Sequence, residues 1–386
     1  MFNGLRIFAT VLFLSLFVAT LVGLTVGANS SIITEDTIWT SANSPYIINE
    51  DLQIASGATL TIKAGVVVKV DSNKKIKVAG NLITYGFEFM PVRFTSNTDD
   101  TWGGIEFIDS TNSSINNTII ENASVAINLG GYSPVNFTGN IFRHNACVVT
   151  DTQGYQSMQF LNNTFSDNRD VFWGIRTLDE SKFENNVFIN NDSVFTFGYY
   201  FGHTAITNNN FINNGFVIKA PARGYGYGTV DISNNWWGTT DANMINSFIE
   251  DGNDDVSLQI LDYNPIKNSK IIDIGSPIDT IPPSDVANFV LSQGENSGEI
   301  DPSWTDPDDL DPEGILIVRN TTGDFTTPTD GISYSDGSGP GGDWCKNIQA
   351  GVQEFTDSGL DVTTTYYYKA YAYDNAFNYS SGLSST

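Results

Sequence analysis

Basic residues are scarce in this 386-residue chain, which has 18 Lys plus Arg against 44 Asp plus Glu and a formal net charge of −26. A chain this acidic is a poor partner for nucleic acid or for an anionic lipid surface, because both carry dense negative charge. The same charge argues more mildly against a polyanionic polymer such as pectin or alginate, although a local basic groove would override it. We therefore expect no nucleic-acid partner.

Cysteine is also scarce, with two residues in the whole chain. Cys147 and Cys345 fall in different predicted domains, so a disulfide between them would have to join those domains. Cys147 stands beside a predicted core position, and we expect it to be a buried thiol.

The long hydrophobic run is at the N-terminus, where Arg6 precedes an apolar stretch that ends in small residues at Ala28. This arrangement is typical of a secretory signal peptide over residues 1–28. The stretch is also long enough to stay as a membrane anchor. In both cases we expect the remaining chain to be extracellular or at the cell surface, with membrane contact only through this segment if it is uncleaved.

Helical periodicity is missing from the middle of the chain, and a 23-residue repeat takes its place. Two series of Asn keep this interval, and three apolar series keep it with them. The Asn series are Asn117, Asn140, Asn163, Asn186 and Asn209, and Asn122, Asn145, Asn168, Asn191 and Asn214. The apolar series are Ile119, Phe142, Phe165, Phe188 and Phe211; Val125, Val148, Val171, Val194 and Val217; and Phe137, Phe160, Phe183 and Ile206. A fixed period of about 20–50 residues indicates a solenoid.

The apolar runs of each repeat are short, rich in Val, Ile and Phe, and end in Asn, Gly or Asp. Such runs are typical of strands and turns. Three short strands fit in each unit, which predicts a parallel β-helix with coils about 4.8 Å apart. Phe and Val should stack as buried ladders. Asn at a corner should tolerate left-handed backbone and bond to the neighbouring coils.

The motif NNWWGTTD, residues 234–241, is the last copy of the repeat motif, with Trp237 in the place of the Phe. The stretch after it has the polar cap and apolar spacing of a short helix. An exposed last coil is an unpaired edge that needs covering. We therefore interpret the motif as the cap of the solenoid, with a ligand platform as the alternative.

The repeat, its NNWWGTTD ending and the following IEDGNDDVSLQILDYNP resemble extracellular right-handed parallel β-helix repeat proteins of prokaryotes. The stretches SGATLTIKAGVVVKVDSNKKIKVAGNLITYG and FTSNTDDTWGGIEF are similar to the opening coils of that family. The resemblance covers roughly residues 37–266 and implies a right-handed parallel β-helix domain over residues 29–266. It does not imply an activity, because the superfamily includes polysaccharide lyases, hydrolases, epimerases, adhesins and inert spacers.

A predicted linker, residues 267–282, ends at the stiff Pro282-Pro283 pair. Residues 283–386 then alternate like antiparallel strands and resemble a fibronectin type III module. Trp304 stands where that family has its core Trp, and Leu360 and Tyr366 match its tyrosine-corner spacing. The expected fold class is all-β: a right-handed parallel β-helix solenoid followed by a fibronectin type III-like β-sandwich.

The repeat places three candidate catalytic residues, Glu121, His144 and Asp167, each four residues after a repeat Asn. In this register they would stack about 5 Å apart on successive coils. A His between two carboxylates suits general acid–base catalysis or metal binding. The alternative is a corner where any polar side chain serves, since Asn190 and Asn213 follow in the same series. We predict that the three are not a catalytic site.

Known β-helix enzymes offer no catalytic residues to carry over. Asp99-Asp100 and Gly202-His203 resemble parts of a polygalacturonase site, but several coils separate them. The clustered calcium-binding carboxylates of a pectate lyase are not found in the regular coils.

A second candidate site is aromatic and would bind a ligand by ring stacking. Its residues recur fifteen positions after the repeat Asn or fall in the following, longer coil, mostly beside Gly. They are Tyr132, Tyr155, Phe201, Tyr225 and Tyr227. If exposed, these rings form a strip on which sugar rings would stack. The alternative is that they pack over a corner as a minor core.

Two acidic loops, residues 306–314 and 250–256, have carboxylates at spacings that could ligate Ca²⁺. In the first loop the candidate ligands are Asp306, Asp308, Asp309 and Asp311. Neither loop matches an EF-hand, and solvated acidic turns are the alternative. We predict no metal site and no cofactor, with Ca²⁺ as the one ion these loops leave open.

The sequence predicts a secreted or surface-displayed scaffold or adhesive protein without catalytic activity. Its expected partner is a polysaccharide or another component of the cell envelope. The competing hypothesis is a carbohydrate-active enzyme, a polysaccharide lyase or a glycoside hydrolase, that uses the β-helix groove. A cleft with paired acid–base groups would favour the enzyme.

Overall fold

The computed structural model of the protein describes residues 31–151, 157–177, 180–224, 229–279, 281–308, 312–330, 332–374 and 377–385. The predicted signal peptide or membrane anchor, residues 1–28, lies outside these ranges. In the parts of the chain that are described, no helix has both the length and the apolar character needed to cross a membrane.

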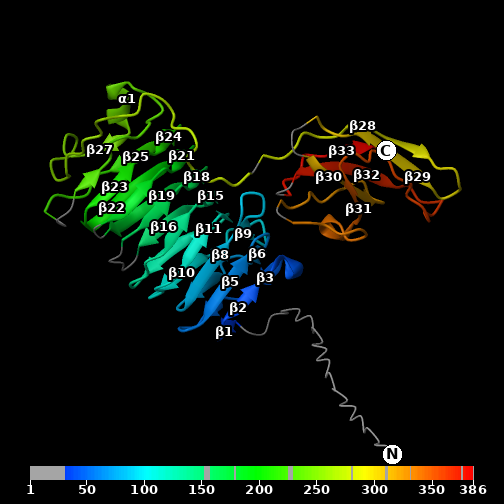
Figure 1. The fold of residues 1–386 in the computed structure, drawn as a ribbon, viewed down its shortest axis with the longest axis horizontal. Coiled ribbons are helices and arrows are strands. Elements are labelled where there is room, and N and C mark those ends of the chain that lie inside the picture. The colour runs from blue at the N-terminus through cyan, green and yellow to red at the C-terminus, as the bar shows by residue number, and fades with distance from the viewer. Residues whose placement is uncertain are drawn as a thin grey trace, which may run out of the picture.

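Residues 32–250 wind into a solenoid of three parallel sheets, with one strand of each sheet in each of the first eight turns (Figure 1). Sheet A contains β1 (Ile32–Ile33), β4 (Leu52–Ile54), β7 (Lys75–Val78), β10 (Gly104–Ile108), β13 (Ile127–Gly130), β16 (Cys147–Asp151), β19 (Asp170–Thr177), β22 (Ser193–Phe201), β25 (Phe216–Lys219) and β27 (Ile249–Glu250). Sheet B contains β2 (Thr37–Trp39), β5 (Thr59–Lys63), β8 (Asn81–Tyr85), β11 (Ser114–Asn116), β14 (Asn136–Thr138), β17 (Gln159–Leu161), β20 (Ser181–Glu184), β23 (Thr204–Thr207) and β26 (Val230–Asp231). Sheet C contains β3 (Tyr46–Ile48), β6 (Val67–Val70), β9 (Val92–Ser96), β12 (Thr118–Glu121), β15 (Ile141–Arg143), β18 (Thr164–Ser166), β21 (Val187–Ile189) and β24 (Asn210–Ile212). The predicted parallel solenoid with three strands per turn is confirmed.

Stacked phenylalanines fill the core as the repeat predicts. Phe142, Phe165, Phe188 and Phe211 are buried, and successive ring centroids lie 5.1, 4.8 and 5.1 Å apart. A second ladder, Phe137, Phe160 and Phe183, stacks at 4.5 and 5.6 Å. The predicted Val ladder from Val148 to Val217 is buried as well.

The first unit of the predicted repeat is displaced by one residue. Ile120, and not Ile119, pairs with Phe142 and faces the core, because the step from β12 to β15 is 22 residues. Ala126 likewise takes the core position predicted for Val125, since Ile127 pairs with Val149. The 23-residue Asn spacing in this unit therefore joins positions that are not equivalent in the fold.

Two buried Asn ladders run along the turns, one at the B-to-C corner and one at the C-to-A corner. In the first, the Oδ1 of Asn186 accepts bonds from the backbone N–H (2.8 Å) and the Nδ2 (3.1 Å) of Asn163. The Nδ2 of Asn186 donates to the carbonyl of Phe160 at 2.9 Å and to Asn209 Oδ1 at 3.1 Å. The corresponding atoms of Asn145, Asn168, Asn191 and Asn214 form the second ladder.

Left-handed backbone lies one residue before each ladder Asn, and not at the Asn as predicted. Positive φ occurs at Asn162, Asn185 and Asn208 at one corner, and at His144 and Asp167 at the other. Asn, Asp and His are the non-glycine residues that tolerate this region best. The ladder position thus favours Asn because its buried side-chain amide bonds to the neighbouring coils. The position before it favours Asn, Asp or His because these residues tolerate left-handed backbone.

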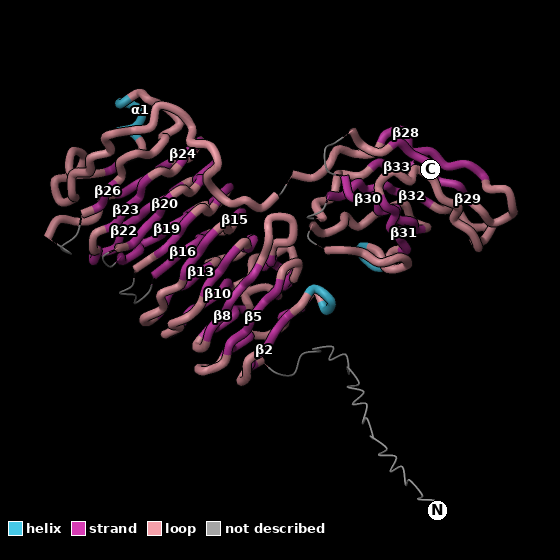
Figure 2. Tube along the Cα trace, in the orientation of Figure 1, coloured by secondary structure: helices cyan, strands magenta, loops and turns pink. Residues whose placement is uncertain are grey.

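The end of the solenoid is closed by the NNWWGTTD motif, as predicted. Trp237 is buried, and its ring centroid lies 5.0 Å from that of Phe211 in the last complete coil. Helix α1 (Ala242–Ser247) follows, and the side chain of Asp241 caps it by accepting a bond from the N–H of Asn243 at 2.8 Å. Figure 2 shows this helix at the end of the stacked strands.

Residues 267–279 of the predicted linker lie along the side of the solenoid. Asn210 exchanges two hydrogen bonds with the backbone of Ile271, at 2.8 and 2.9 Å. Further along, Ser276 Oγ donates to the carbonyl of Gly139 at 2.6 Å, and Ile278 packs on Ile119 and Ile141. The segment therefore runs back from the last coils toward the first ones (Figure 1).

The second domain is an antiparallel, sandwich-like pair of sheets. One sheet pairs β28 (Ala287–Gln293) with β29 (Ile300–Thr305). The other has the order β31 (Trp344–Gln349), β30 (Pro312–Asn320), β32 (Tyr367–Asp374) and β33 (Leu383–Ser385). Trp304 is buried between the sheets, and the N–H of Asp361 donates to the Oη of Tyr366 at 3.2 Å. The all-β fold class, a parallel solenoid followed by a β-sandwich, is confirmed.

Candidate functional site

The three candidate catalytic residues do not stack as predicted. Glu121 pairs across the sheet with Arg143, because the displaced first unit moves it out of register with His144. The Glu121 carboxylate is buried, and its oxygens lie 2.6 Å from Arg93 Nη2 and 2.7 Å from Arg143 Nε. The predicted His flanked by two carboxylates is therefore not formed.

The ion-paired cluster of Glu121, Arg93 and Arg143 connects the two domains. Arg93 also donates from Nη1 to the carbonyl of Asp330, in the second domain, at 2.6 Å. Asp330 in turn accepts at Oδ1 from the N–H of Tyr379 at 2.9 Å. The best-buried carboxylate of the candidate set thus holds the sandwich against the N-terminal half of the solenoid.

Glu121 is ionised over the whole physiological pH range. Burial acts to raise the pKa of its carboxyl group, but the charges and hydrogen bonds of Arg93 and Arg143 outweigh burial and lower the pKa to about 2. A carboxyl group with this pKa carries no proton near neutral pH, so Glu121 cannot act as a general acid there.

We expect Glu121 to make the folded protein acid-sensitive. Its pKa is lowered from the model-compound value of 4.5 to about 2, so its stabilising contribution is complete above about pH 4.5 and is lost as the pH falls toward 2. Glu121→Gln should unfold at a lower urea concentration than the wild type at pH 6, and this gap should narrow by pH 3.

Glu106→Gln is the matched control, because Glu106 forms a partly exposed pair with Lys75 at 3.8 Å. Its urea midpoint should stay close to wild type at both pH values. A Glu121→Gln gap that is the same at pH 6 and pH 3 would contradict this account.

His144 and Asp167 remain neighbours at the C-to-A corner, where both are exposed on left-handed backbone. They line a shallow polar groove of about 510 Å³ together with Arg169, Asn190 and Asp192. The Nδ2 of Asn190 donates to Asp167 Oδ1 at 3.3 Å. The groove offers hydrogen-bonding groups to a ligand. However, its residues His144, Asp167 and Asn190 stand at corner positions with left-handed backbone, and this conformation alone explains why His, Asp and Asn occur there.

The predicted aromatic strip is described only in part. Tyr132 is exposed, with 58% of its surface accessible. Tyr155, Tyr225 and Tyr227, and the side chain of Phe201, lie outside the described part of the structure. The strip therefore stays a prediction. Tyr132, the member whose side chain is described, is exposed as the strip requires.

Trp173 is an exposed aromatic residue that the sequence-based search for a binding site missed. It lies on β19 with 54% of its surface accessible, between Thr150 and Thr196 on the adjacent strands. A signal was present in the repeat, because the ten-residue offset from Asn163 gives Trp where neighbouring coils have Thr. The predicted strip was built from aromatic residues that recur with the repeat, and the aromatic residue at position 173 does not recur.

The acidic loops are organised by hydrogen bonds within the chain. Asp306 accepts from Trp304 Nε1 at 2.8 Å and from the N–H of Gly351 at 2.7 Å. Asp251 accepts from the N–H groups of Asn253 and Leu261 at 2.8 and 2.9 Å. Of the other predicted ligands, Asp309 and Asp311 fall outside the described ranges, while Asp308 is exposed. Among the described residues, no group of three or more His, Cys, Asp or Glu is placed to hold a metal ion.

Both cysteines are buried free thiols. Burial, with a smaller contribution from Asp170, raises the pKa of Cys147 to about 12. Burial also raises the pKa of Cys345. Neither thiol is activated for nucleophilic chemistry, which needs a lowered pKa.

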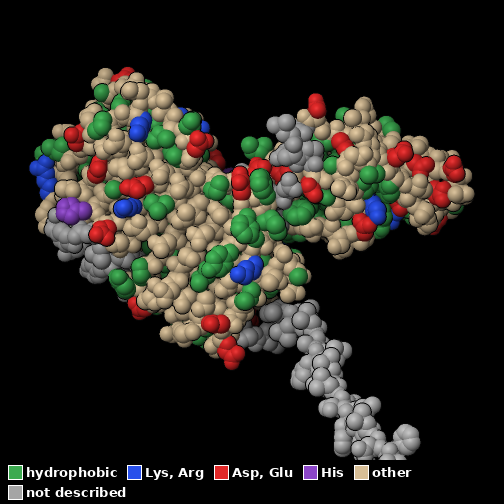
Figure 3. Space-filling view, in the orientation of Figure 1, with side chains coloured by type: hydrophobic (Ala, Val, Ile, Leu, Met, Phe, Trp, Pro, Cys, Tyr) green, Lys and Arg blue, Asp and Glu red, His purple; other side chains and the backbone are tan. Residues whose placement is uncertain are grey.

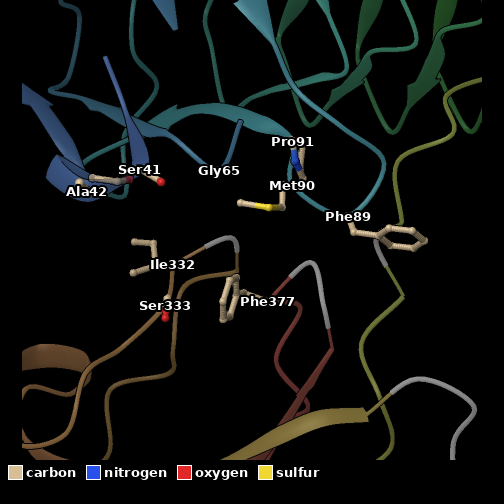
Figure 4. Close-up of a pocket in the computed structure, with 10 residues that line it drawn as sticks. Ser41, Ala42, Gly65, Phe89, Met90, Pro91, Ile332, Ser333 and Phe377 are labelled. Atoms are coloured by element: carbon tan, nitrogen blue, oxygen red, sulfur yellow. The ribbon is translucent and has the colours of Figure 1, made fainter. Parts of the chain in front are cut away.

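A cavity of about 290 Å³ lies where the two domains meet (Figure 4). Met90 and Phe89 approach from the solenoid, and Ile332 and Phe377 face them from the sandwich. Three serines add hydroxyl groups, but the Oγ of Ser44 is already bonded to the N–H of Val67 at 2.9 Å. The cavity is thus largely apolar, without the charged or paired acid–base groups of a catalytic pocket.

No protein-family model matches this chain. The search of curated proteins likewise gives no match.

Proposed function

We propose that the protein is an extracellular or cell-surface scaffold or adhesive protein without catalytic activity, and that it binds polysaccharide or another component of a cell envelope. Its solenoid would belong with the right-handed β-helix repeat proteins of prokaryotes that end in NNWWGT. The second domain would be a fibronectin type III-like module. The strand order β31–β30–β32–β33, the buried Trp304 and the bond to Tyr366 Oη support this assignment.

The observation that carries the proposal is the participation of Glu121 in an ion-paired cluster that joins the two domains. Both oxygens of this buried carboxylate are held by Arg93 and Arg143, and Arg93 extends the network to Asp330 of the sandwich. Removing one partner of a buried ion pair strongly destabilises the folded protein, so we interpret this cluster as a structural contact between the two domains. The arrangement favours a protein selected for a rigid two-domain shape over one selected for acid–base chemistry.

Binding to a glycan array, together with a cleavage assay on the same glycans, tests the proposal. We expect the mature protein to bind a subset of glycans and to release no reducing ends or unsaturated products from them. Cleavage at a rate above that of a buffer control would favour the competing hypothesis of a carbohydrate-active enzyme.

One observation favours that alternative, a lyase or glycoside hydrolase, enough to test it. His144 and Asp167 share an open groove of the size that takes a sugar chain. We expect His144→Ala to leave any glycan-cleaving activity within a few-fold of wild type, whereas loss of a general acid–base costs about 10²–10⁴-fold. A loss of that size, with an unchanged circular dichroism spectrum, would establish the enzyme.

A further inference from the structure

The outer face of sheet A carries one column of side chains along the solenoid, defined by strand pairing. From first to last coil the column contains Ile32, Gln53, Lys77, Glu106, Asn128, Thr150, Trp173, Thr196, Lys219 and Glu250. Successive members lie about 4.8 Å apart. Trp173 is the single aromatic residue in this column, near its middle, and is flanked on both sides by threonine.

The repeat directs position 173 outward but does not require an aromatic residue there. Phe172 beside it points into the core, where it stacks on Phe195 at 4.9 Å, so this coil already has its apolar filling. Trp173 adds nothing to that filling and leaves 54% of its surface in solvent. A large aromatic side chain placed outward among threonines is typical of a contact surface rather than of a core.

The backbone next to Trp173 is irregular. The pairing of β19 with β22 is irregular between Trp173 and Ile175, which places a bulge at Gly174. Bulges re-aim side chains and often lie beside binding sites. Gly174 has φ +63°, and a Cβ at this residue would meet no atom within 4 Å other than those of its chain neighbours Trp173 and Ile175.

The lysines of this column, and Lys75 beside it, are ion-paired. Lys77 pairs with Asp51 at 2.8 Å, and Lys219 pairs with Glu250 at 2.7 Å. The Nζ of Lys75 lies 3.8 Å from Glu106. Since these cations are paired and the whole chain has a net charge of −26, an anionic polymer gains little here. Figure 3 shows acidic and basic side chains dispersed over the visible surface of the solenoid.

We propose that Trp173 is the stacking platform of a binding site for a neutral polysaccharide on the outer face of sheet A. The apolar face of one sugar ring lies on the indole, and the hydroxyl groups of Thr150 and Thr196 bond to the sugar hydroxyls on either side. This inference rests on the proposed function and specifies its ligand class. It adds a residue that lies outside the predicted aromatic strip.

The polar groove at the C-to-A corner lies just before the start of β19, the strand that carries Trp173. Arg169, which lines the groove, precedes Trp173 by four residues, or about 13 Å of extended chain. In our proposal the next rings of a polysaccharide held at Trp173 lie over this groove, beside His144, Asp167 and Asn190. These side chains then act as hydrogen-bonding partners of the sugar chain.

Trp173→Ala tests the site, with Tyr85→Ala as the matched control. Tyr85 is also an exposed aromatic strand residue, with 48% of its surface accessible, but it lies on sheet B. The probes are soluble xylan, glucomannan and mixed-linkage β-glucan in affinity gels, and insoluble cellulose and chitin in pull-downs. At least one should retain the wild type, and Trp173→Ala should weaken this binding about tenfold or more. Tyr85→Ala should bind within twofold of wild type.

Two further readouts keep the outcome interpretable. The thermal transition of Trp173→Ala should match that of the wild type, because the indole is exposed, so lost binding cannot be ascribed to unfolding. Binding should also change little between 50 and 500 mM salt, because stacking is not screened. If the wild type binds a neutral glycan and Trp173→Ala binds equally well, the site assignment is wrong and the proposed function stands. If the wild type binds none of these glycans, the inference fails, and binding to any other envelope glycan on the array still supports the proposed function.

Discussion

Phe165→Ala is expected to destabilise the protein by about 3–5 kcal/mol, the usual cost of removing a buried phenyl ring. Phe165 is fully buried in the middle of its ladder, with ring centroids 5.1 Å from Phe142 and 4.8 Å from Phe188. It also meets Phe172 edge-on at 5.4 Å. The coils above and below fix these neighbours, so the cavity cannot collapse. The midpoint of urea unfolding, followed by circular dichroism, measures the loss.

Ser166→Ala is the control for this prediction. Ser166 follows Phe165 on β18 but is partly exposed on the outer side of the sheet. Its replacement should shift the free energy of unfolding by no more than about 0.5 kcal/mol. Equal effects of the two substitutions would show that the Phe ladder is not the core of the solenoid.

Asn186→Leu is expected to have a comparable effect through hydrogen bonds instead of packing. It removes the acceptor of two bonds from Asn163 and the donors to Phe160 and Asn209. Asn186 is completely buried, so water cannot replace these partners. Each buried polar group left unsatisfied costs about 1–3 kcal/mol, so we expect a total loss of roughly 3–6 kcal/mol.

Asn190→Gly is the matched control for Asn186→Leu. Asn190 lies on the same coil, four residues later, but is exposed on left-handed backbone that glycine adopts freely. The urea midpoint of Asn190→Gly should stay near that of the wild type. A variant at Asn190 that loses as much stability as Asn186→Leu would contradict the division between ladder and corner positions.

The period of the repeat predicted the solenoid because stacking makes equivalent positions identical in environment. Phe165 and Phe188 repeat since each must fill the same layer of the core. The same logic failed in the first unit, where Asn117 and Asn122 keep the 23-residue spacing but occupy the left-handed corner positions. Asn suits both the buried ladder and the corner, so residue type alone could not distinguish the two registers.

The candidate site was less predictable because it depends on contacts between distant segments. The partners of Glu121 come from β9, β15 and, through Arg93, the loop at Asp330, 237 residues from Arg93 in sequence. Periodicity within the coils contains no information on these contacts. It likewise gave no indication that residues 267–279 return along the solenoid and place the sandwich beside the first coils.

We propose that the protein binds a polysaccharide and leaves it intact. The most direct measurement incubates the mature protein for a day with a glycan that it retains, then analyses the recovered glycan by mass spectrometry. We predict that the glycan is retained by the wild type and recovered at its original chain length. Shortened or unsaturated chains that appear with the wild type, and not with a buffer control, would contradict this prediction.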